Sequence, residues 1–167
     1  MKTHAFYRLV FAMLCLLGVG LSAHAAGPDD EAALSGLKDV KVIFDITTGD
    51  AKKLLSRLGL VEETRDDLVK QGVKPHFILA FRGLASLLVQ KDENRIKLED
   101  LDVATKIKQK LKEMSKDPSY ELNQCAVANR YLKIKNEDTI PEVHVIGNSW
   151  VSLAAYQTKG YAYIPID

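Results

Sequence analysis

Hydrophobic and polar positions along the chain follow two alternating patterns, one typical of buried strands and one of amphipathic helices. Five short runs predict strands, at residues 39–47, 74–81, 119–125, 141–147 and 161–166. Apolar residues that recur every three or four positions predict helices between them, at residues 51–72, 99–115, 126–133 and 148–160. Residues 84–90, with the sequence LASLLVQ, fit either period, so their conformation stays open.

Strand and helix alternate through the chain, and this order predicts an α/β fold. We expect a single three-layer α/β/α domain with a five-stranded, mainly parallel sheet, because right-handed crossovers place helices on both faces of such a sheet. Asp50 is expected to cap the first long helix, and Gly160 to follow the last one. Pro165 cannot donate a ladder hydrogen bond, so the last strand is expected at a sheet edge.

The first 25 residues have the pattern of a cleavable signal peptide. Lys2 and Arg8 form a basic start, residues 9–21 form a short apolar run, and Ala23 and Ala25 place small residues before the expected cleavage point. The apolar run is shorter than the roughly 20 residues of a membrane span. An uncleaved membrane anchor is the alternative.

Cleavage after Ala25 would give a periplasmic or secreted protein with no membrane contact. Its 142 residues suit one domain, at 38–167, preceded by a flexible lead-in at 26–37. Without the two basic residues of the leader, the 23 basic residues fall to 21, against 22 acidic ones. This near-neutral balance gives no support for nucleic acid as a partner. The lysines of 106–116 are read as the solvated face of a helix.

The carboxyl ends of the strands are the expected binding region, because ligands gather there in open parallel sheets. Besides Cys125, the residues predicted at these ends are Thr47, Thr48, Gly49, Arg82, Gly83, Gly147, Asn148, Ser149 and Trp150. The sequence has no GxGxxG motif and no P-loop, so nucleotide binding is disfavoured. His76 and His144 have no metal-site spacing with Cys125, and neither a metal nor another cofactor is expected.

Cys125 is the one cysteine outside the leader, so the processed chain cannot form an internal disulfide. It is expected where the third strand ends and a helix begins, and backbone N–H groups there would lower its pKa. A thiolate so placed suits persulfide formation or thiol exchange. Two alternatives stay open: a buried thiol that packs as a small apolar group, and a thiol that pairs between chains.

Trp150 and Tyr156 lie on the helix predicted at 148–160. A place in the core is favoured for both side chains, and a subunit contact is the alternative.

The order of strands, helices and cysteine resembles the DsrE/DsrF-like family over nearly all of residues 38–167. The resemblance rests on KVIFDITTG, on KPHFILAFRG, on the cysteine after the third strand, and on the ending VHVIGNSWVSLAAYQTKGYAYIPI. It implies a small α/β/α domain that forms homo- or hetero-oligomers. It also implies that Cys125 matches the cysteine with which the best understood members relay sulfur as a persulfide.

The resemblance leads us to expect a periplasmic sulfur (persulfide) carrier that acts through Cys125, with sulfurtransferase-like chemistry. The expected partners are sulfur donor and acceptor proteins and further copies of the chain, as a trimer or hexamer. The sulfur-relay members act in the cytoplasm, whereas this chain carries a leader. The alternative is a non-catalytic oligomeric module that uses the cleft at the strand ends to bind a small ligand.

Overall fold

The computed structural model describes residues 28–167. Five parallel strands form a sheet in the order β4-β3-β2-β1-β5. The strands are β1 (Asp39–Ile46), β2 (Lys74–Phe81), β3 (Tyr120–Cys125), β4 (His144–Ile146) and β5 (Ala162–Ile166). The α-helices are α2 (Glu31–Leu34), α3 (Ala51–Lys70), α4 (Leu101–Met114), α5 (Ala126–Tyr131) and α6 (Ser149–Thr158). Within the described residues, three 3₁₀ helices join them: η2 (Gly83–Val89), η3 (Leu98–Asp100) and η4 (Asn136–Asp138).

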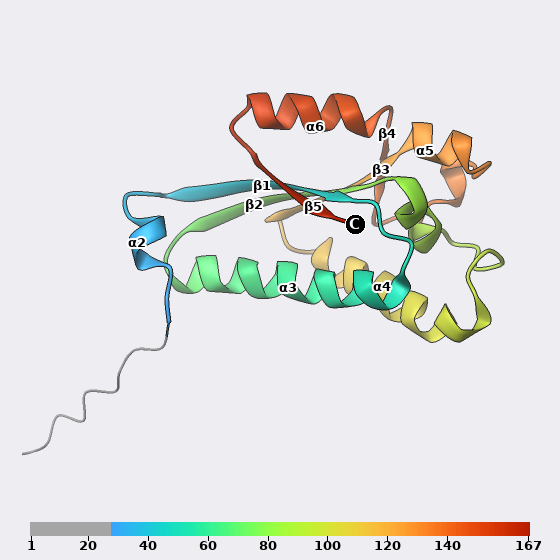
Figure 1. The fold of residues 1–167 in the computed structure, drawn as a ribbon, viewed down its shortest axis with the longest axis horizontal. Coiled ribbons are helices and arrows are strands. Elements are labelled where there is room, and N and C mark those ends of the chain that lie inside the picture. Colours follow the sequence, from blue (N-terminus) through green and yellow to red (C-terminus); the bar gives the residue numbers. More distant parts are fainter. Residues whose placement is uncertain (1–27) are drawn as a thin grey trace, which may run out of the picture. The chain divides into compact units, whose positions relative to one another are not determined.

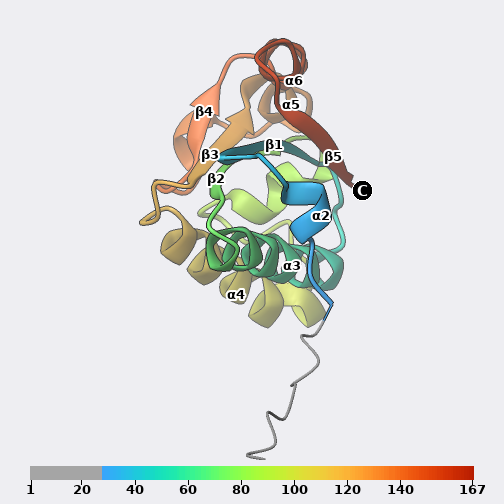
Figure 2. The same ribbon diagram turned by 90° about the vertical axis from the view of Figure 1, so that its left-hand side faces the viewer.

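Helices cover both faces of the sheet. α3 and α4 lie against one face, and α5 and α6 lie on the other (Figure 1). The same division is visible after a quarter turn (Figure 2). The predicted α/β fold, with a five-stranded parallel sheet between helices, is therefore confirmed.

The sheet face that carries α3 and α4 holds the larger hydrophobic core. Phe77 is fully buried there, and its ring packs edge-on against Phe44 and Tyr120, with centroid distances of 5.3 and 6.0 Å. Helix α3 contributes Leu54 and Leu58, one turn apart on its buried side. This spacing is the pattern that predicted the helix.

The opposite face has a much smaller apolar core, formed by Ile43, Ile78, Ala80 and Leu153. Polar groups occupy much of the rest of this face. The alternation of side chains along a strand places Asp45, Asn123 and Cys125 on it, and all three residues are buried. This polar face holds the candidate site.

The predicted ends of two helices and the predicted edge strand are confirmed. The Asp50 carboxylate caps α3 by accepting the Lys53 N–H at 2.9 Å, and Gly160 follows α6 with a φ of 85°. β5 lies at a sheet edge, as Pro165 predicts. The segment 84–90, left open by its sequence, lies largely in the 3₁₀ helix η2.

The prediction of a strand at 141–147 was too long. β4 contains only three residues, because Pro141 and Glu142 form a turn in which the Val143 N–H donates to the Ile140 carbonyl at 3.1 Å. Pro141 has no N–H to give to a ladder, which favours the turn.

The predicted signal peptide, at 1–25, lies outside the described residues. The helix α2 lies within the segment predicted as the lead-in, at 26–37. Across residues 28–167, no helix has both the length and the apolar character that a membrane crossing requires.

Phe77→Ala should lower the free energy of unfolding by about 3–5 kcal/mol, because it removes a fully buried ring that the surrounding side chains cannot replace. Leu98→Ala is the control: this side chain is 85% exposed, and its loss should change stability by less than about 0.5 kcal/mol. Urea unfolding of residues 26–167 measures both. Similar losses of unfolding free energy in the two variants would contradict the buried packing of the Phe77 ring.

Candidate functional site

A pocket of about 440 Å³ opens at the carboxyl ends of β2 and β3. Its walls come from the β2–η2 junction, from α5 and from the first residues of α6. Cys125, the last residue of β3, lines this pocket although the whole residue is only 4% exposed. It is also the one free cysteine in the part of the chain that the structure describes.

The first turn of α6 contacts the thiol. Asn148 caps this helix through its side-chain oxygen, which accepts the Trp150 N–H at 3.0 Å. The N–H groups of a first helical turn have no partner within the helix. One of them, the N–H of Ser149, donates to the Cys125 Sγ at 3.3 Å.

The hydroxyl of Ser149 lies beside the same sulfur. Ser149 is fully buried, and its Oγ has no hydrogen-bond partner of good geometry within residues 28–167. A buried hydroxyl without a partner is costly, and such groups gather at sites that bind or react. A negative charge on the sulfur, or a group attached to it, would give this hydroxyl an acceptor.

The thiol of Cys125 has a pKa below its ordinary value. Burial raises this pKa, but the hydroxyl and N–H of Ser149 and the N–H groups of Ala128 and Val127, which lie near the sulfur, together lower it by more. These donors stabilise the thiolate, which is the reactive form of cysteine. The local setting therefore favours a nucleophile over an inert thiol.

A buried ion pair lies on the same face of the sheet. Asp45 in β1 is 2% exposed, and Arg82 donates to both of its oxygens, through Nε at 2.6 Å and Nη2 at 2.7 Å. The Tyr163 hydroxyl of β5 donates to Asp45 Oδ2 at 2.7 Å. The bonds to Asp45 raise the pKa of Arg82 and also that of Tyr163, so both groups stay protonated. Arg82 then extends to the pocket that Cys125 lines.

Two glycines allow the loops at the strand ends to approach each other. Gly83 has a φ of 57°, a left-handed conformation that turns the chain directly after Arg82. At Gly49, a Cβ atom would lie 2.7 Å from the Leu84 Cβ. Only glycine lets the loop after β1 pack this closely on η2.

The residues predicted at the strand ends divide into two groups. Arg82, Gly83, Asn148 and Trp150 line the pocket with Cys125, and Ser149 contacts its sulfur, whereas Gly147 does not line it. The residues after β1, which are Thr47, Thr48 and Gly49, do not line it.

The segment after β1 belongs to a neighbouring depression. Gly49 lines a second pocket, of about 520 Å³, together with Arg95 and Lys97. Thr48 is buried and accepts the Asp50 N–H at 3.2 Å, and the Thr47 carbonyl accepts the Ala85 N–H at 3.3 Å. Leu84 lines both pockets, so the single cleft expected from the sequence is divided at this side chain.

Sequence reasoning missed Asp45 and Tyr163. The signal for Asp45 was an acidic residue directly inside the apolar run VIFDI, since a buried carboxylate requires a partner. The bond from Tyr163 spans 118 positions of the chain, and no local pattern predicts it.

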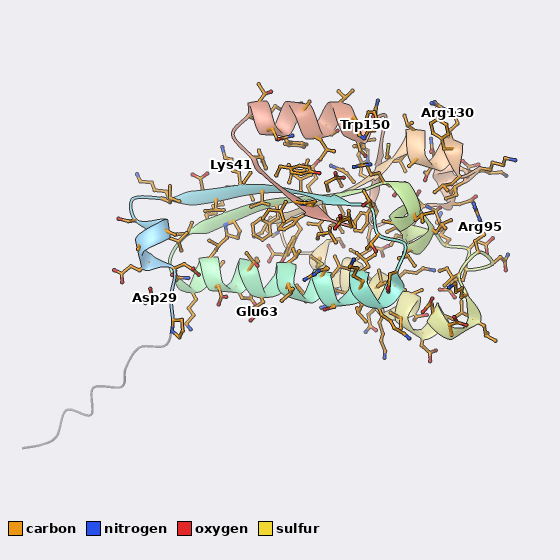
Figure 3. The ribbon with its side chains drawn as sticks, in the orientation of Figure 1. Asp29, Lys41, Glu63, Arg95, Arg130 and Trp150 are labelled. Carbon is orange, nitrogen blue, oxygen red and sulfur yellow. The ribbon has the colours of Figure 1, made fainter. Side chains whose placement is uncertain are left out.

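The core position favoured for Trp150 was wrong. Trp150 is 70% exposed at the start of α6, on the side nearer to α5 (Figure 3). Tyr156 is partly buried and packs against the small core, and its hydroxyl donates to Glu121 at 2.9 Å. Helix α6 turns Ser149, Leu153 and Tyr156 toward the sheet, and Trp150 falls outside this stripe.

A metal centre finds no support in the part of the chain that the structure describes. His76, His144 and the acidic residues form no group of three or more side chains that could hold an ion.

No family model matches the chain. An uncharacterized protein of Aquifex aeolicus is 27% identical over 126 residues, which are 75% of this chain and 56% of that protein. The chain thus spans little more than half the length of this relative. Among solved structures, a protein of unknown function from Methanobacterium thermoautotrophicum has a TM-score of 0.59 at 18% identity, covering 76% of this chain and 99% of that one. This likeness concerns the α/β fold alone.

Ser149→Ala should shift the pH profile of Cys125 alkylation to higher pH. The wild-type thiol has a lowered pKa, so iodoacetamide should reach its half-maximal rate at a lower pH than with a free thiol. Removing the hydroxyl removes a donor to the thiolate, and alkylation at neutral pH should slow severalfold. Folding should be unaffected, because the hydroxyl has no other partner among the described residues. Ser152→Ala, one turn later on α6, is the control, and an equal shift in both variants would exclude the role given to Ser149.

Proposed function

We propose that the protein is a sulfur carrier, which holds sulfane sulfur as a persulfide on Cys125 and passes it on. The observation that carries this proposal is the setting of the thiol. Cys125 lines an open pocket, its sulfur accepts the Ser149 N–H at 3.3 Å, and its pKa is lowered. The resemblance to DsrE/DsrF-like proteins supports the same reading, because it implies that Cys125 corresponds to their active cysteine.

Uptake of sulfur by this thiol is a displacement at sulfur. The Cys125 thiolate attacks the outer sulfur of a persulfide R–S–SH, the S–S bond of the donor breaks, and the thiolate R–S⁻ leaves with the electron pair of that bond. The product is Cys125–S–SH, and no external oxidant is needed because the sulfane sulfur arrives already oxidised. A second thiolate then removes the outer sulfur by the same reaction.

The first turn of α6 is suited to such a product. The terminal sulfur of a persulfide carries negative charge, and the Ser149 hydroxyl is a buried donor near the Cys125 thiol without another partner in the described chain. Hydrogen bonds to a charged acceptor contribute about 1.5–3 kcal/mol. The site therefore offers stabilisation to the loaded form as well as to the free thiolate.

A non-catalytic binding module is the second candidate. The observation that favours it is the apolar rim of the pocket, where Leu84, Tyr131 and Trp150 are largely exposed. Such a rim suits a ligand or a protein partner whether or not the thiol reacts.

Export and assembly belong to the proposal as well. We propose removal of residues 1–25 on export, which N-terminal sequencing of the processed protein decides.

We also propose a homo-oligomer, a trimer or hexamer. It is supported by exposed apolar side chains at the edge strand β5, where Tyr163 and Ile164 lie. Light scattering at micromolar concentration measures the assembly, and a monomer mass would refute it.

Incubation with a small persulfide donor should add the mass of one sulfur atom to the protein, and reductant should remove it. Cys125→Ser should abolish the mass shift while the thermal transition stays within a few degrees, because the core consists of other residues. Intact-mass spectrometry makes the measurement. Unchanged mass, together with a thiol that alkylates only after denaturation, would leave the sulfur carrier without support. A fast thiol that never retains sulfur would favour the binding module.

A further inference from the structure

We infer that Arg82 is the anion-binding group of the Cys125 pocket, and that its ligands are small persulfides with one carboxylate and an apolar body. This inference deepens the proposed function by naming the class of sulfur donor, and it rests on that function. Three features of the site support it: the N–H donors that Arg82 leaves unused, the bonds that hold the guanidinium in place, and the composition of the pocket wall.

Arg82 has hydrogen-bonding capacity left for a ligand. A guanidinium carries five N–H groups in a fixed plane. Asp45 accepts two of them, from Nε and from Nη2. No other acceptor within residues 28–167 bonds to the guanidinium, so the edge away from Asp45 is unused. The Arg82 side chain is 27% exposed and lines the pocket, where a ligand can reach this edge.

The guanidinium is held in place before any ligand arrives. Asp45 is buried in a central strand, and its Oδ2 accepts from both Arg82 and Tyr163, each at 2.7 Å. The carboxylate cannot rotate without losing one of these bonds. A group fixed in this way loses little conformational freedom on binding an anion, which favours affinity.

The pocket wall limits what the anion can be attached to. Its volume, about 440 Å³, is within the range of small-molecule sites. Apart from Arg82, Cys125 and Asn148, the side chains that line it are apolar or aromatic: Leu84, Val127, Ala128, Tyr131, Leu132 and Trp150. Arg82 is the one cationic residue in this lining. A ligand with one negative group and an apolar body fits this wall, whereas a polyanion does not.

Charge and reaction chemistry are compatible in this arrangement. The carboxylate of the donor would bind Arg82 while its outer sulfur faces Cys125. The thiolate attacks that sulfur, the donor S–S bond breaks, and the carboxylate-bearing thiolate leaves with the bonding electron pair. Asp45 already balances the charge of Arg82, so the guanidinium attracts the ligand mainly through directed hydrogen bonds.

Two donors of similar size test the inference, mercaptopropionate persulfide and the uncharged mercaptoethanol persulfide. The second-order rate constant for loading Cys125, followed by intact mass, should be at least about tenfold higher for the carboxylate donor. A hydrogen bond to a charged group contributes enough free energy to account for about a tenfold difference in rate or more. The ratio of the two rates is the readout, since each protein sample serves as its own control for folding and thiol reactivity.

Arg82→Gln should reduce this ratio to near one while the uncharged donor still loads Cys125. Because this change leaves Asp45 buried without a charged partner, the double variant Asp45→Asn/Arg82→Gln is made as well, and it should give the same ratio. Arg57→Gln is the control of equal charge: Arg57 is an exposed residue of α3, on the opposite face of the sheet and outside the pocket lining, and this variant should keep the wild-type ratio.

Equal rates for the two donors in the wild type, or a ratio unchanged by Arg82→Gln, would overturn the inference and leave the sulfur carrier standing. Loading by neither donor would overturn the sulfur carrier and the donor class together. Anion binding is then decided separately by mercaptopropionate in its reduced form, which should protect Cys125 from iodoacetamide in the wild type but not in Arg82→Gln. Absence of protection would remove Arg82 as an anion-binding group.

Discussion

The constraint on which the site depends is the buried carboxylate of Asp45. It lies in β1, which pairs with β2 on one side and β5 on the other, and its partners are Arg82, directly after β2, and Tyr163 of β5. An unpaired charge at this depth would cost several kcal/mol, and loss of one member of such a pair costs about 3–5 kcal/mol. The pair therefore requires Arg82 to fold back over the sheet. The same side chain contributes the one cation to the wall of the Cys125 pocket, so a requirement of folding also shapes the site.

The two faces of the sheet have different roles. The face under α3 and α4 contains most of the large buried side chains, Phe77 and Leu54 among them, and can hold the fold together. The face under α6 has a small apolar core, and polar groups take up the remaining area. Stabilising one face by packing allows the other to keep a thiol, an ion pair and a buried hydroxyl of Ser149 without a partner in the described chain. Strained or unsatisfied groups persist where the surrounding structure is rigid enough to hold them.

Sequence patterns could predict the fold because its elements are local. The bounds of β2 were predicted correctly, since KPHFILAF contains the continuous apolar run FILAF and lies between the turn at Gly72 and the left-handed Gly83. β4 was predicted too long, because alternation in PEVHVIG continues through a turn that only the surrounding structure defines. The site was predictable in part: the rule about strand ends brought Arg82 and Asn148 together with Cys125. It failed for the residues from Thr47 to Gly49: Gly49 packs on Leu84 of η2 and lines the neighbouring pocket, and no local pattern predicts this contact. It also missed the ion pair, whose members are 37 positions apart and meet only through strand register.

A thiol without a second cysteine restricts the chemistry that the proposed function allows. In the part of the chain that the structure describes, Cys125 has no cysteine nearby that could resolve a persulfide or a mixed disulfide. Sulfur held on Cys125 would therefore have to leave by attack of a thiol from outside the described domain, and that thiol must reach the pocket. Tyr131 and Trp150 line this pocket and are 79% and 70% exposed, so an acceptor could approach over these two side chains. A donor held by Arg82 and an acceptor that arrives over this aromatic rim would use different walls of one pocket. The small donor can leave before the acceptor binds, so loading and unloading need not compete for the same contacts.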